Sequence, residues 1–488
     1  MSAALAASDP PLQQPTTRRA FVCRCGQPVF FRNSQCVVCK TPLGYDPDIA
    51  LLLPLDAEGD DGSLWHAAGP AADADAALAA RRYRRCGNFD NAAGCNWLLP
   101  VLPGDETLQA DGPANAQAAK DEAEATAPSA PAGGPSGATP PRRRPDAAPG
   151  TSGLSQSLQS AGAASDAPPA ASAASRPAPT GAEPRQTLCR ACRLNRTIPD
   201  QTIEEHRRWW AEIERAKRRL VSSLIALRLP VASLVSEDPA RGLAFDLLRA
   251  PPDGPPVTTG HADGIITLDV EEADDSRREG RKAALREPYR TLLGHLRHEV
   301  GHYYWQRLVD GTAWLEPFRA LFGDERTDYA AALQRHYEQG PPADWPLSHV
   351  SAYASAHPWE DWAETWAHYL HMLDTLDTAA SFGLDAAQVE LGYEPFTHPV
   401  LTSLEPGAAQ APGAAPPAAD APGRADEDFL QFVNAWMKLT GVLNELSRSM
   451  GLPDFYPFVL SVAAVRKLHL VHQVVSGLRV APQAPEAA

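Results

Sequence analysis

The segment that most constrains the fold of this chain is His298-Glu299-Val300-Gly301-His302, because its chemistry requires a helix. Residues four apart on an α-helix lie on one face, about one turn apart, so the imidazoles of His298 and His302 can reach one metal ion. Glu299 then lies at the flank of that ion and can accept a proton from a water molecule that the metal activates. This pattern is typical of zinc peptidase centres, although three fixed residues in five also recur by chance.

The flanks of this pentapeptide indicate whether its helix is buried or solvated. They are apolar or aromatic, and comprise Leu292, Leu293, Leu296, Tyr303, Tyr304 and Trp305. A pair of histidines and a carboxylate is costly to bury unless these groups are paired or bind a metal. We therefore expect residues 281–309 to contain a buried helix that holds a zinc ion, with Pro288 near its start.

A third ligand must come from elsewhere, because a catalytic zinc usually has three protein ligands and one open position. The best source is the aromatic and acidic segment 353–371, in which Pro358 is suited to the first turn of a helix. Glu360 and Glu364 are four residues apart on that helix, so one carboxylate can bind the metal while the other orients a ligand histidine. The surrounding aromatic residues indicate burial. Weaker candidates for the third ligand are Asp361, His357, His368 and His371.

The eight cysteines form three groups, and such close pairs in a reducing compartment are typical of metal ligands. The first group predicts a tetrahedral zinc that supplies folding free energy to a small unit. Its members are Cys23, Cys25, Cys36 and Cys39. The other two groups together predict a second Cys₄ site, with the intervening segment looped out at a closure cost that grows only logarithmically with length. Its members are Cys86, Cys95, Cys189 and Cys192.

Low-complexity segments divide the chain into parts. Residues 104–186 consist largely of Ala, Pro, Gly and Ser, so they cannot bury enough apolar surface to offset their ordering entropy and are predicted to be disordered. We expect the same of residues 1–18 and of a linker at 403–424. The remaining parts are a zinc-ribbon head at 19–103, a catalytic domain at 187–402 and a C-terminal helical extension at 425–480. Strands are predicted at 243–249 and 264–270.

Charge and hydropathy restrict the partners and the location. The formal net charge of −16 argues against nucleic acid as the default partner. No apolar run approaches the ~18 residues that span a bilayer, so no membrane segment is predicted. The N-terminus does not show the basic start and apolar core of a secretory signal, so we expect a cytoplasmic protein. The sequence contains no indication of an oligomeric state.

Several stretches resemble a bacterial family of zinc-binding metallopeptidases with an N-terminal zinc ribbon. These are the cysteine knuckles with Gln-Pro-Val-Phe-Phe and the segments 189–200, 357–371 and 449–460. The resemblance covers nearly all of the chain outside the two low-complexity tracts. It implies an α+β, mainly helical fold with a zincin-like core, a small zinc-ribbon head and long disordered linkers.

The segment Glu360-Asp-Trp-Ala-Glu364 is also similar to Glu-Phe-Phe-Ala-Glu in the anthrax-lethal-factor type of glutamate zincin. That resemblance implies that Glu360 is the ligand, that Glu364 orients a histidine, and that Tyr353 stabilises the oxyanion. The predicted protein is thus a peptidase with Glu299 as general base and one catalytic and two structural zinc ions. Strand 264–270 is predicted to be the sheet edge that pairs with an extended peptide.

The alternative is a non-catalytic zinc-ribbon and zincin-like module that binds a partner protein or nucleic acid. The intact Glu299 favours the enzyme, because a binding module has no need of a general base.

Overall fold

The computed structural model of the chain describes residues 18–59, 62–101, 187–251, 254–285, 291–390, 395–402 and 423–480. The segment 104–186, predicted to be disordered, lies outside these ranges, as do nearly all of 1–18 and 403–424. Within the described ranges, no helix combines the length and the apolar character that crossing a membrane requires.

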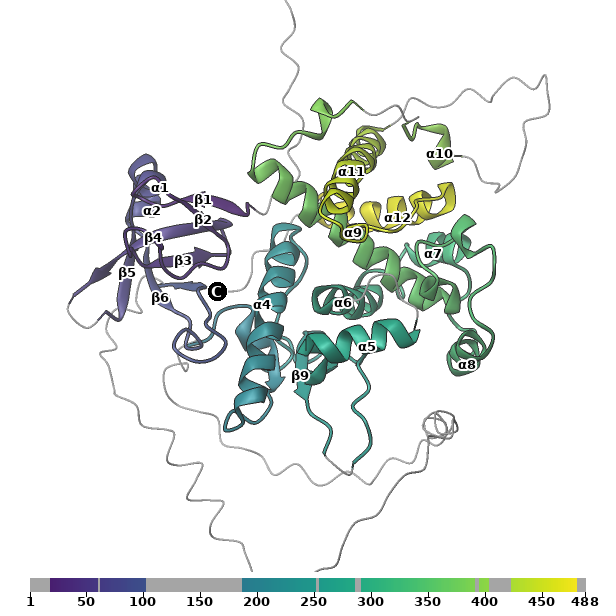
Figure 1. Cartoon of the computed structure of the whole chain (residues 1–488), viewed down its shortest axis with the longest axis horizontal. Helices are drawn as coiled ribbons and strands as arrows, with labels where there is room; N and C mark the ends of the chain where they lie inside the picture. Colours follow the sequence, from purple (N-terminus) through teal and green to yellow (C-terminus); the bar gives the residue numbers. More distant parts are fainter. Residues whose placement is uncertain are drawn as a thin grey trace, which may run out of the picture. The chain divides into compact units, whose positions relative to one another are not determined.

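The N-terminal part is built from short antiparallel strands (Figure 1). A two-stranded sheet contains β1 (Ala20–Val22) and β2 (Pro28–Phe30), which run antiparallel. A five-stranded sheet follows in chain order, with β3 (Leu43–Asp46), β4 (Leu51–Glu58), β5 (Leu64–Ala67), β6 (Arg82–Arg85) and β7 (Leu98–Pro100). The short helices α1 (Pro70–Ala74) and α2 (Ala76–Ala79) connect β5 to β6. A bridge between Tyr45 and Trp97 brings the first and last strands of this sheet together.

A second, mixed sheet of four strands lies in the C-terminal part and has the order β10-β11-β9-β8. Its strands are β8 (Asn195–Thr197), β9 (Ala244–Leu248), β10 (Gly260–Ala262) and β11 (Ile265–Asp269). β9 runs parallel to both β8 and β11, whereas β10 is antiparallel to β11. The strands predicted at 243–249 and 264–270 are thereby confirmed.

The prediction that strand 264–270 forms the sheet edge is wrong, because β11 pairs on both sides. Asp263 and Gly264 have φ angles of 48° and 79°, and they form a two-residue turn that folds β10 back onto β11. An Asp-Gly pair with positive φ at both residues is a strong hairpin signal. In the described part of this sheet, the outer strand beside the helix that carries His298 and His302 is therefore β10.

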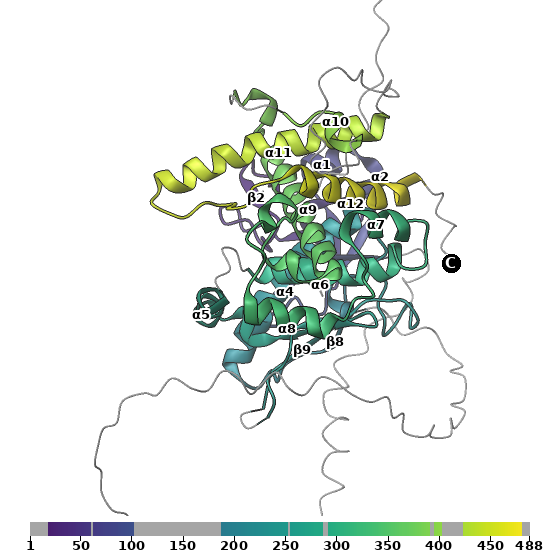
Figure 2. The ribbon, with the colours of Figure 1, turned by 90° about the vertical axis from the view of Figure 1, so that its right-hand side faces the viewer.

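Helices make up most of the remainder (Figures 1 and 2). The longer helices are α4 (Glu204–Ala226), α5 (Asp275–Leu285), α6 (Leu292–Leu308), α7 (Leu315–Phe322), α8 (Tyr329–Gln339), α9 (Pro358–Ser381), α11 (Arg424–Ser449) and α12 (Val462–Val480), and α10 (Pro399–Thr402) is short. One-turn 3₁₀ segments are η2 (Cys192–Leu194), η3 (Val270–Ala273), η4 (Trp345–Leu347), η5 (Tyr353–Ala356) and η6 (Ala386–Gln388). The helix expected within 281–309 begins at Leu292, where the Thr291 hydroxyl accepts a hydrogen bond from Gly294 N at 3.0 Å.

The two helices that carry the predicted metal ligands pack directly on each other. A Cβ atom at Gly301 of α6 would lie 3.0 Å from Cα and 3.3 Å from the carbonyl oxygen of Ala363 in α9. The indole Nε1 of Trp362 donates a hydrogen bond of 3.0 Å to the carbonyl oxygen of Gly301. Gly301 therefore allows the close approach of α6 and α9, while α11 and α12 contact α9 from another direction (Figure 2).

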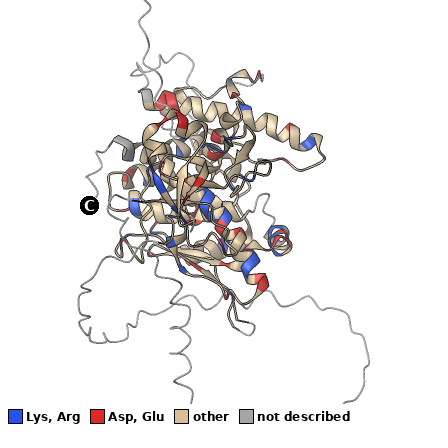
Figure 3. Ribbon diagram, turned by 90° about the vertical axis from the view of Figure 1, so that its left-hand side faces the viewer, with Lys and Arg blue, Asp and Glu red and all other residues tan. Residues whose placement is uncertain are grey.

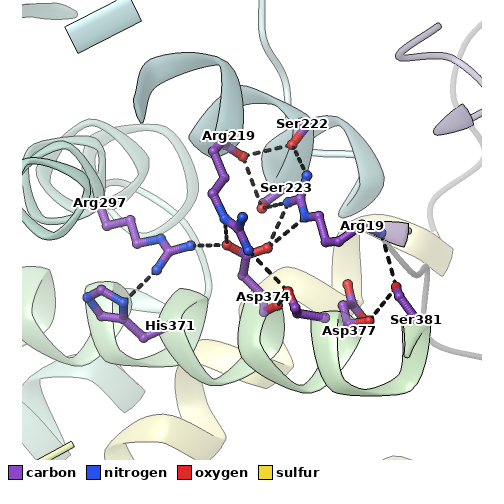
Figure 4. A network of polar contacts seen from close by, with 10 residues as sticks. Arg19, Arg219, Ser222, Ser223, Arg297, His371, Asp374, Asp377 and Ser381 are labelled. Atoms are coloured by element: carbon purple, nitrogen blue, oxygen red, sulfur yellow. Dashed lines mark hydrogen bonds and ion pairs between the residues drawn. The ribbon is translucent and has the colours of Figure 1, made fainter. Parts of the chain in front are cut away.

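A buried carboxylate connects the N-terminal part to both helices (Figure 4). Asp374 of α9 is 3% exposed and accepts hydrogen bonds from three arginines. Arg19 donates to its Oδ1 from Nη2 at 2.7 Å, and Arg219 of α4 and Arg297 of α6 donate to its Oδ2 at 2.5 and 2.6 Å. Because Arg297 directly precedes His298, this network ends beside the first predicted metal ligand.

Candidate metal centre

Three side chains from α6 and α9 direct donor atoms at one point. His298 and His302 are one turn apart on α6, and their Nε2 atoms are separated by 3.2 Å. Glu360 lies in the first turn of α9, with its Oε2 atom 3.0 Å from Nε2 of His298 and 3.6 Å from Nε2 of His302. The structure thus brings together His298, His302 and Glu360, the ligand set that the resemblance implies.

The spacing of these three atoms fits a tetrahedral zinc ion. Zinc bonds to nitrogen and oxygen are about 2.0 to 2.1 Å long, which places neighbouring ligand atoms about 3.3 Å apart. The Oε2 atom of Glu360 is also buried and accepts no hydrogen bond from the residues that the structure describes. A buried carboxylate oxygen without a donor is costly, so the site is chemically suited to a cation.

The other atoms of the ligand residues are fixed by hydrogen bonds. Nδ1 of His298 lies 2.7 Å from Oε1 of Glu364, and the hydroxyl of Ser351 donates to Oε2 of Glu364 at 2.5 Å. The hydroxyl of Tyr329 in α8 donates to Oε1 of Glu360 at 2.6 Å. Such partners orient metal ligands and select the tautomer of a ligand histidine.

The electrostatics of the site reflect this clustering. Burial alone would lower the pKa of His298, but Glu360 and Glu364 raise it well above its usual value. Burial alone would raise the pKa of the carboxyl groups of Glu360 and Glu364. Instead, His302 and His298 hold the pKa of Glu360 well below its usual value. The hydrogen bond with His298 contributes to lowering the pKa of Glu364 to about 2. Both glutamates are therefore anionic at neutral pH, as a cation site requires.

The two predicted catalytic side chains lie next to this cluster. Glu299 is 8% exposed, and burial raises the pKa of its carboxyl group above the usual value despite the opposing effect of His298 and His302. The ring of Tyr353, in η5, has its centroid 5.9 Å from that of His298. Burial raises the pKa of the Tyr353 hydroxyl, so this group keeps its proton and can donate a hydrogen bond.

The four weaker ligand candidates have other partners. Asp361 pairs with Lys467 at 2.5 Å, and His357 caps α9 by accepting a hydrogen bond from Trp359 N at 3.0 Å. His368 lies 2.5 Å from the Tyr456 hydroxyl, and His371 lies 2.5 Å from Nη1 of Arg297. None of the four belongs to the group of converging donor atoms in the described residues.

Sequence reasoning missed three residues that shape the site, namely Tyr329, Ser351 and Trp359. The ring of Trp359 has its centroid 4.1 Å from that of His302 and covers one side of the centre. Tyr329 reaches Glu360 from a separate helix, 31 residues earlier in the chain, so no local pattern indicates it. Ser351 has a weak signal, because it lies two residues before the aromatic and acidic segment that supplies Glu364.

The eight cysteines form two groups of four, and each group has its Sγ atoms within 4.8 Å of one another. Cys23 and Cys39 have Sγ atoms 3.6 Å apart, Cys25 and Cys36 3.8 Å, and Cys95 and Cys189 3.6 Å. Zinc–sulfur bonds of about 2.3 Å in a tetrahedron separate sulfurs by about 3.8 Å, so both groups fit zinc. In the second group, Cys86 Sγ also accepts a hydrogen bond from Cys189 N at 3.4 Å.

Comparisons with known proteins identify a family and a domain that the chain matches. A family model described as "Putative zinc-binding metallo-peptidase" matches residues 206–474, and a zinc-ribbon domain model matches residues 20–110. Proteins of Mycobacterium tuberculosis (strain ATCC 25618 / H37Rv) and Mycobacterium bovis, both named as uncharacterized, are 43% identical to this chain over 289 residues. The alignment covers 59% of this chain and 76% of each relative. No solved structure matches the chain.

Proposed function

Because the chain belongs to the family described as "putative zinc-binding metallo-peptidase" and carries a zinc-ribbon domain, we propose that it hydrolyses peptide bonds in a peptide or protein substrate. The observation that supports this proposal most is the convergence of His298, His302 and Glu360 on one point, with Glu299 adjacent. A structural metal site is usually closed by four protein ligands, whereas three ligands with an open position are typical of a catalytic one.

We assign the catalytic metal to His298, His302 and Glu360, and one structural zinc to each group of four cysteines, which makes three per chain. Zinc bound by the first set supplies Lewis-acid chemistry that acidifies water and polarises a carbonyl group. The remaining chemistry belongs to the side chains around it, and their positions support distinct roles.

Glu299 acts as the general base in this proposal. Burial disfavours its charged form and raises its pKa, which brings its basicity closer to that needed near neutral pH. It accepts a proton from the attacking water and then delivers that proton to the leaving amine. Tyr353 keeps its proton and donates a hydrogen bond to the oxyanion that forms at the scissile carbonyl.

The orienting contacts hold the donor atoms in place. Glu364 fixes the ring of His298 through Nδ1, and Ser351 in turn fixes Glu364. Tyr329 holds the second oxygen of Glu360 and leaves the first directed at the two histidines. An extended substrate can add to β10, the outer strand beside α6, by pairing of main-chain groups.

The test is a comparison of Glu299→Gln with the natural protein on a peptide library. The variant should keep its zinc content and lose peptide hydrolysis by at least about 10²-fold, because a general base contributes about 10² to 10⁴ in rate. Glu445→Gln, at an exposed position of α11, is the matched control and should retain full activity.

Activity of Glu299→Gln equal to that of the natural protein would contradict the mechanism. Absence of hydrolysis from zinc-loaded natural protein across the library would favour the alternative, a zincin-like module that binds a partner without cleaving it.

A further inference from the structure

A cavity of about 770 Å³ lies away from the His298 cluster, beside α4 and the first turn of α6. Its lining contains seven arginines but three carboxylates, Glu212, Asp274 and Asp275. The chain as a whole has a formal charge of −16, and both signs are scattered over the ribbon (Figure 3). The lining therefore has a net charge opposite to that of the protein. This difference indicates that the positive charge serves the cavity and is not a general property of the surface.

Ion pairs balance only part of the positive charge of this lining. Arg215 pairs with Glu212 at 2.7 Å, and Arg278 pairs with Asp275. Arg19 and Arg219, which also line the cavity, share the single carboxylate of Asp374 (Figure 4). Arg297 binds the same carboxylate, so Asp374 balances only part of the charge of three guanidinium groups, two of which line the cavity.

Arg218 provides an independent indication that an acceptor belongs in this place. Its side chain is 5% exposed and lines the cavity, and its Nη2 donates to the carbonyl oxygen of Ala93 at 2.9 Å. Its Nη1 is buried and has no hydrogen-bond partner among the residues that the structure describes. A buried donor without an acceptor costs about 1 to 3 kcal/mol, and more when it is charged. A bound anion that accepts a hydrogen bond from Nη1 would remove this free-energy cost.

The beginning of α6 adds a second attraction for negative charge. Thr291, Leu292 and Leu293 line the cavity and form the N-cap and first turn of this 17-residue helix. The N–H groups of a first helical turn carry partial positive charge and bind phosphate or carboxylate oxygens. The N-terminus of a helix and the guanidinium groups thus border the same space.

The size and rim of the cavity restrict the ligand further. Its volume is in the range of about 300 to 1,000 Å³ that is usual for small-molecule sites. Phe30 and Phe382 line it as well, with ring centroids 6.1 Å apart in a stacked arrangement, and are 44% and 55% exposed. An exposed aromatic pair next to arginines suits the organic part of a charged metabolite.

We propose that this cavity binds a small organic phosphate with at least two negative charges. Guanidinium groups recognise phosphate oxygens through paired hydrogen bonds, and several of them together can balance a multiply charged group. The site is separate from the metal centre, and the proposal does not rest on peptidase activity.

The experiment is isothermal titration calorimetry on the full-length, zinc-loaded chain in about 0.15 M salt, which screens weak surface attraction. The probes are fructose 1,6-bisphosphate, ADP and, as a carboxylate comparison, succinate, with zinc content measured before and after each titration. We expect saturable one-site binding of at least one phosphate ester and none of succinate. Tighter binding of ADP than of the sugar phosphate would indicate that the aromatic rim contacts a nucleobase. The reverse order would indicate that the site binds sugar phosphates.

The variants separate the cavity from general electrostatics. Arg208→Gln with Arg215→Gln removes two exposed charges from the lining and should weaken binding at least tenfold, and Arg218→Met should do the same. Arg326→Gln with Arg335→Gln removes two exposed charges elsewhere and should leave binding unchanged. The proposal is overturned by any one of three results: no saturable binding of either phosphate, equal weakening in the control, or succinate binding as tightly as the phosphates.

Discussion

The Nδ1 atom of His298 lies 2.7 Å from Oε1 of Glu364, which leaves the opposite ring nitrogen directed at Glu360. The two glutamates are one turn apart on α9, but their surroundings differ. Glu364 has partners on both oxygens, whereas one oxygen of Glu360 is buried without a donor in the described part of the chain. We therefore assign metal binding to Glu360 and orientation of His298 to Glu364.

Replacing the two glutamates separately by glutamine tests this division. Glu360→Gln should remove the catalytic zinc, so that the zinc content falls by one ion per chain, because an amide oxygen is a poor substitute for the buried carboxylate. Glu364→Gln should keep the ion but weaken its binding by about 10- to 100-fold, the usual effect of losing an orienting partner. Elemental analysis after dialysis and a competition titration with a chelator measure both. Loss of the metal only in Glu364→Gln would reverse the assignment.

Two tyrosines near the site should have different effects when replaced by phenylalanine. Tyr329→Phe removes the hydrogen bond of 2.6 Å to Oε1 of Glu360, so we expect weaker zinc affinity. Tyr353→Phe removes an oxyanion donor and should lower kcat by about 10²-fold with zinc affinity unchanged. Measuring both quantities for both variants provides the internal control. Equal loss of zinc affinity in the two variants would contradict the role proposed for Tyr353.

Gly301→Ala should destabilise the fold by about 1 to 3 kcal/mol, the usual cost of inserting a methyl group into a packed core. Its Cβ would lie 3.0 Å from Cα of Ala363 and 3.3 Å from Cβ of Trp366, so α6 and α9 would have to separate. Urea unfolding measures the free energy of unfolding. Gly280→Ala in α5 is the matched control, because a Cβ there meets no atom within 4 Å and alanine favours a helix. Similar stability changes in both variants would refute the packing argument.

The pH dependence of kcat/KM should show an acidic limb that belongs to Glu299. A general base must be ionised, so activity is present above its pKa and is lost as the pH falls through it. Burial raises this pKa above its usual value of 4.5, so the midpoint of the limb should lie above 4.5. The hydrogen bond with His298 contributes to lowering the pKa of Glu364 to about 2, which is too acidic to produce this limb. Zinc content must stay constant over the measured range, and a midpoint at or below 4.5 would argue against a buried base.

Local patterns in the sequence predict the parts of the site that lie within single helices. The spacing of His298 and His302, and of Glu360 and Glu364, places each pair on one helical face, and the aromatic flanks indicate burial. Those patterns leave the choice between the glutamates open, because it depends on where α8 and Ser351 lie relative to α9. Tyr329 reaches the site only through the tertiary fold, so sequence spacing offers no route to it.

The prediction for the sheet was less accurate for a comparable reason. Alternating apolar residues identify 264–270 as a strand but do not show how many neighbours it has. The turn at Asp263-Gly264 adds β10 and converts the predicted edge into an interior strand.

The second cysteine group has a consequence for proteolysis. Gly87 N donates to the carbonyl oxygen of Thr187 at 2.7 Å, and Cys86 and Cys95 meet Cys189 and Cys192 beside that bond. Gly87 and Thr187 are thus held side by side, although they are 100 positions apart in the sequence. A protease that cuts between residues 102 and 186 should yield two fragments on a denaturing gel and a single species on a native one. A chelator should then separate the fragments, because a metal ion bound by two cysteines of each fragment would hold them together after the cut.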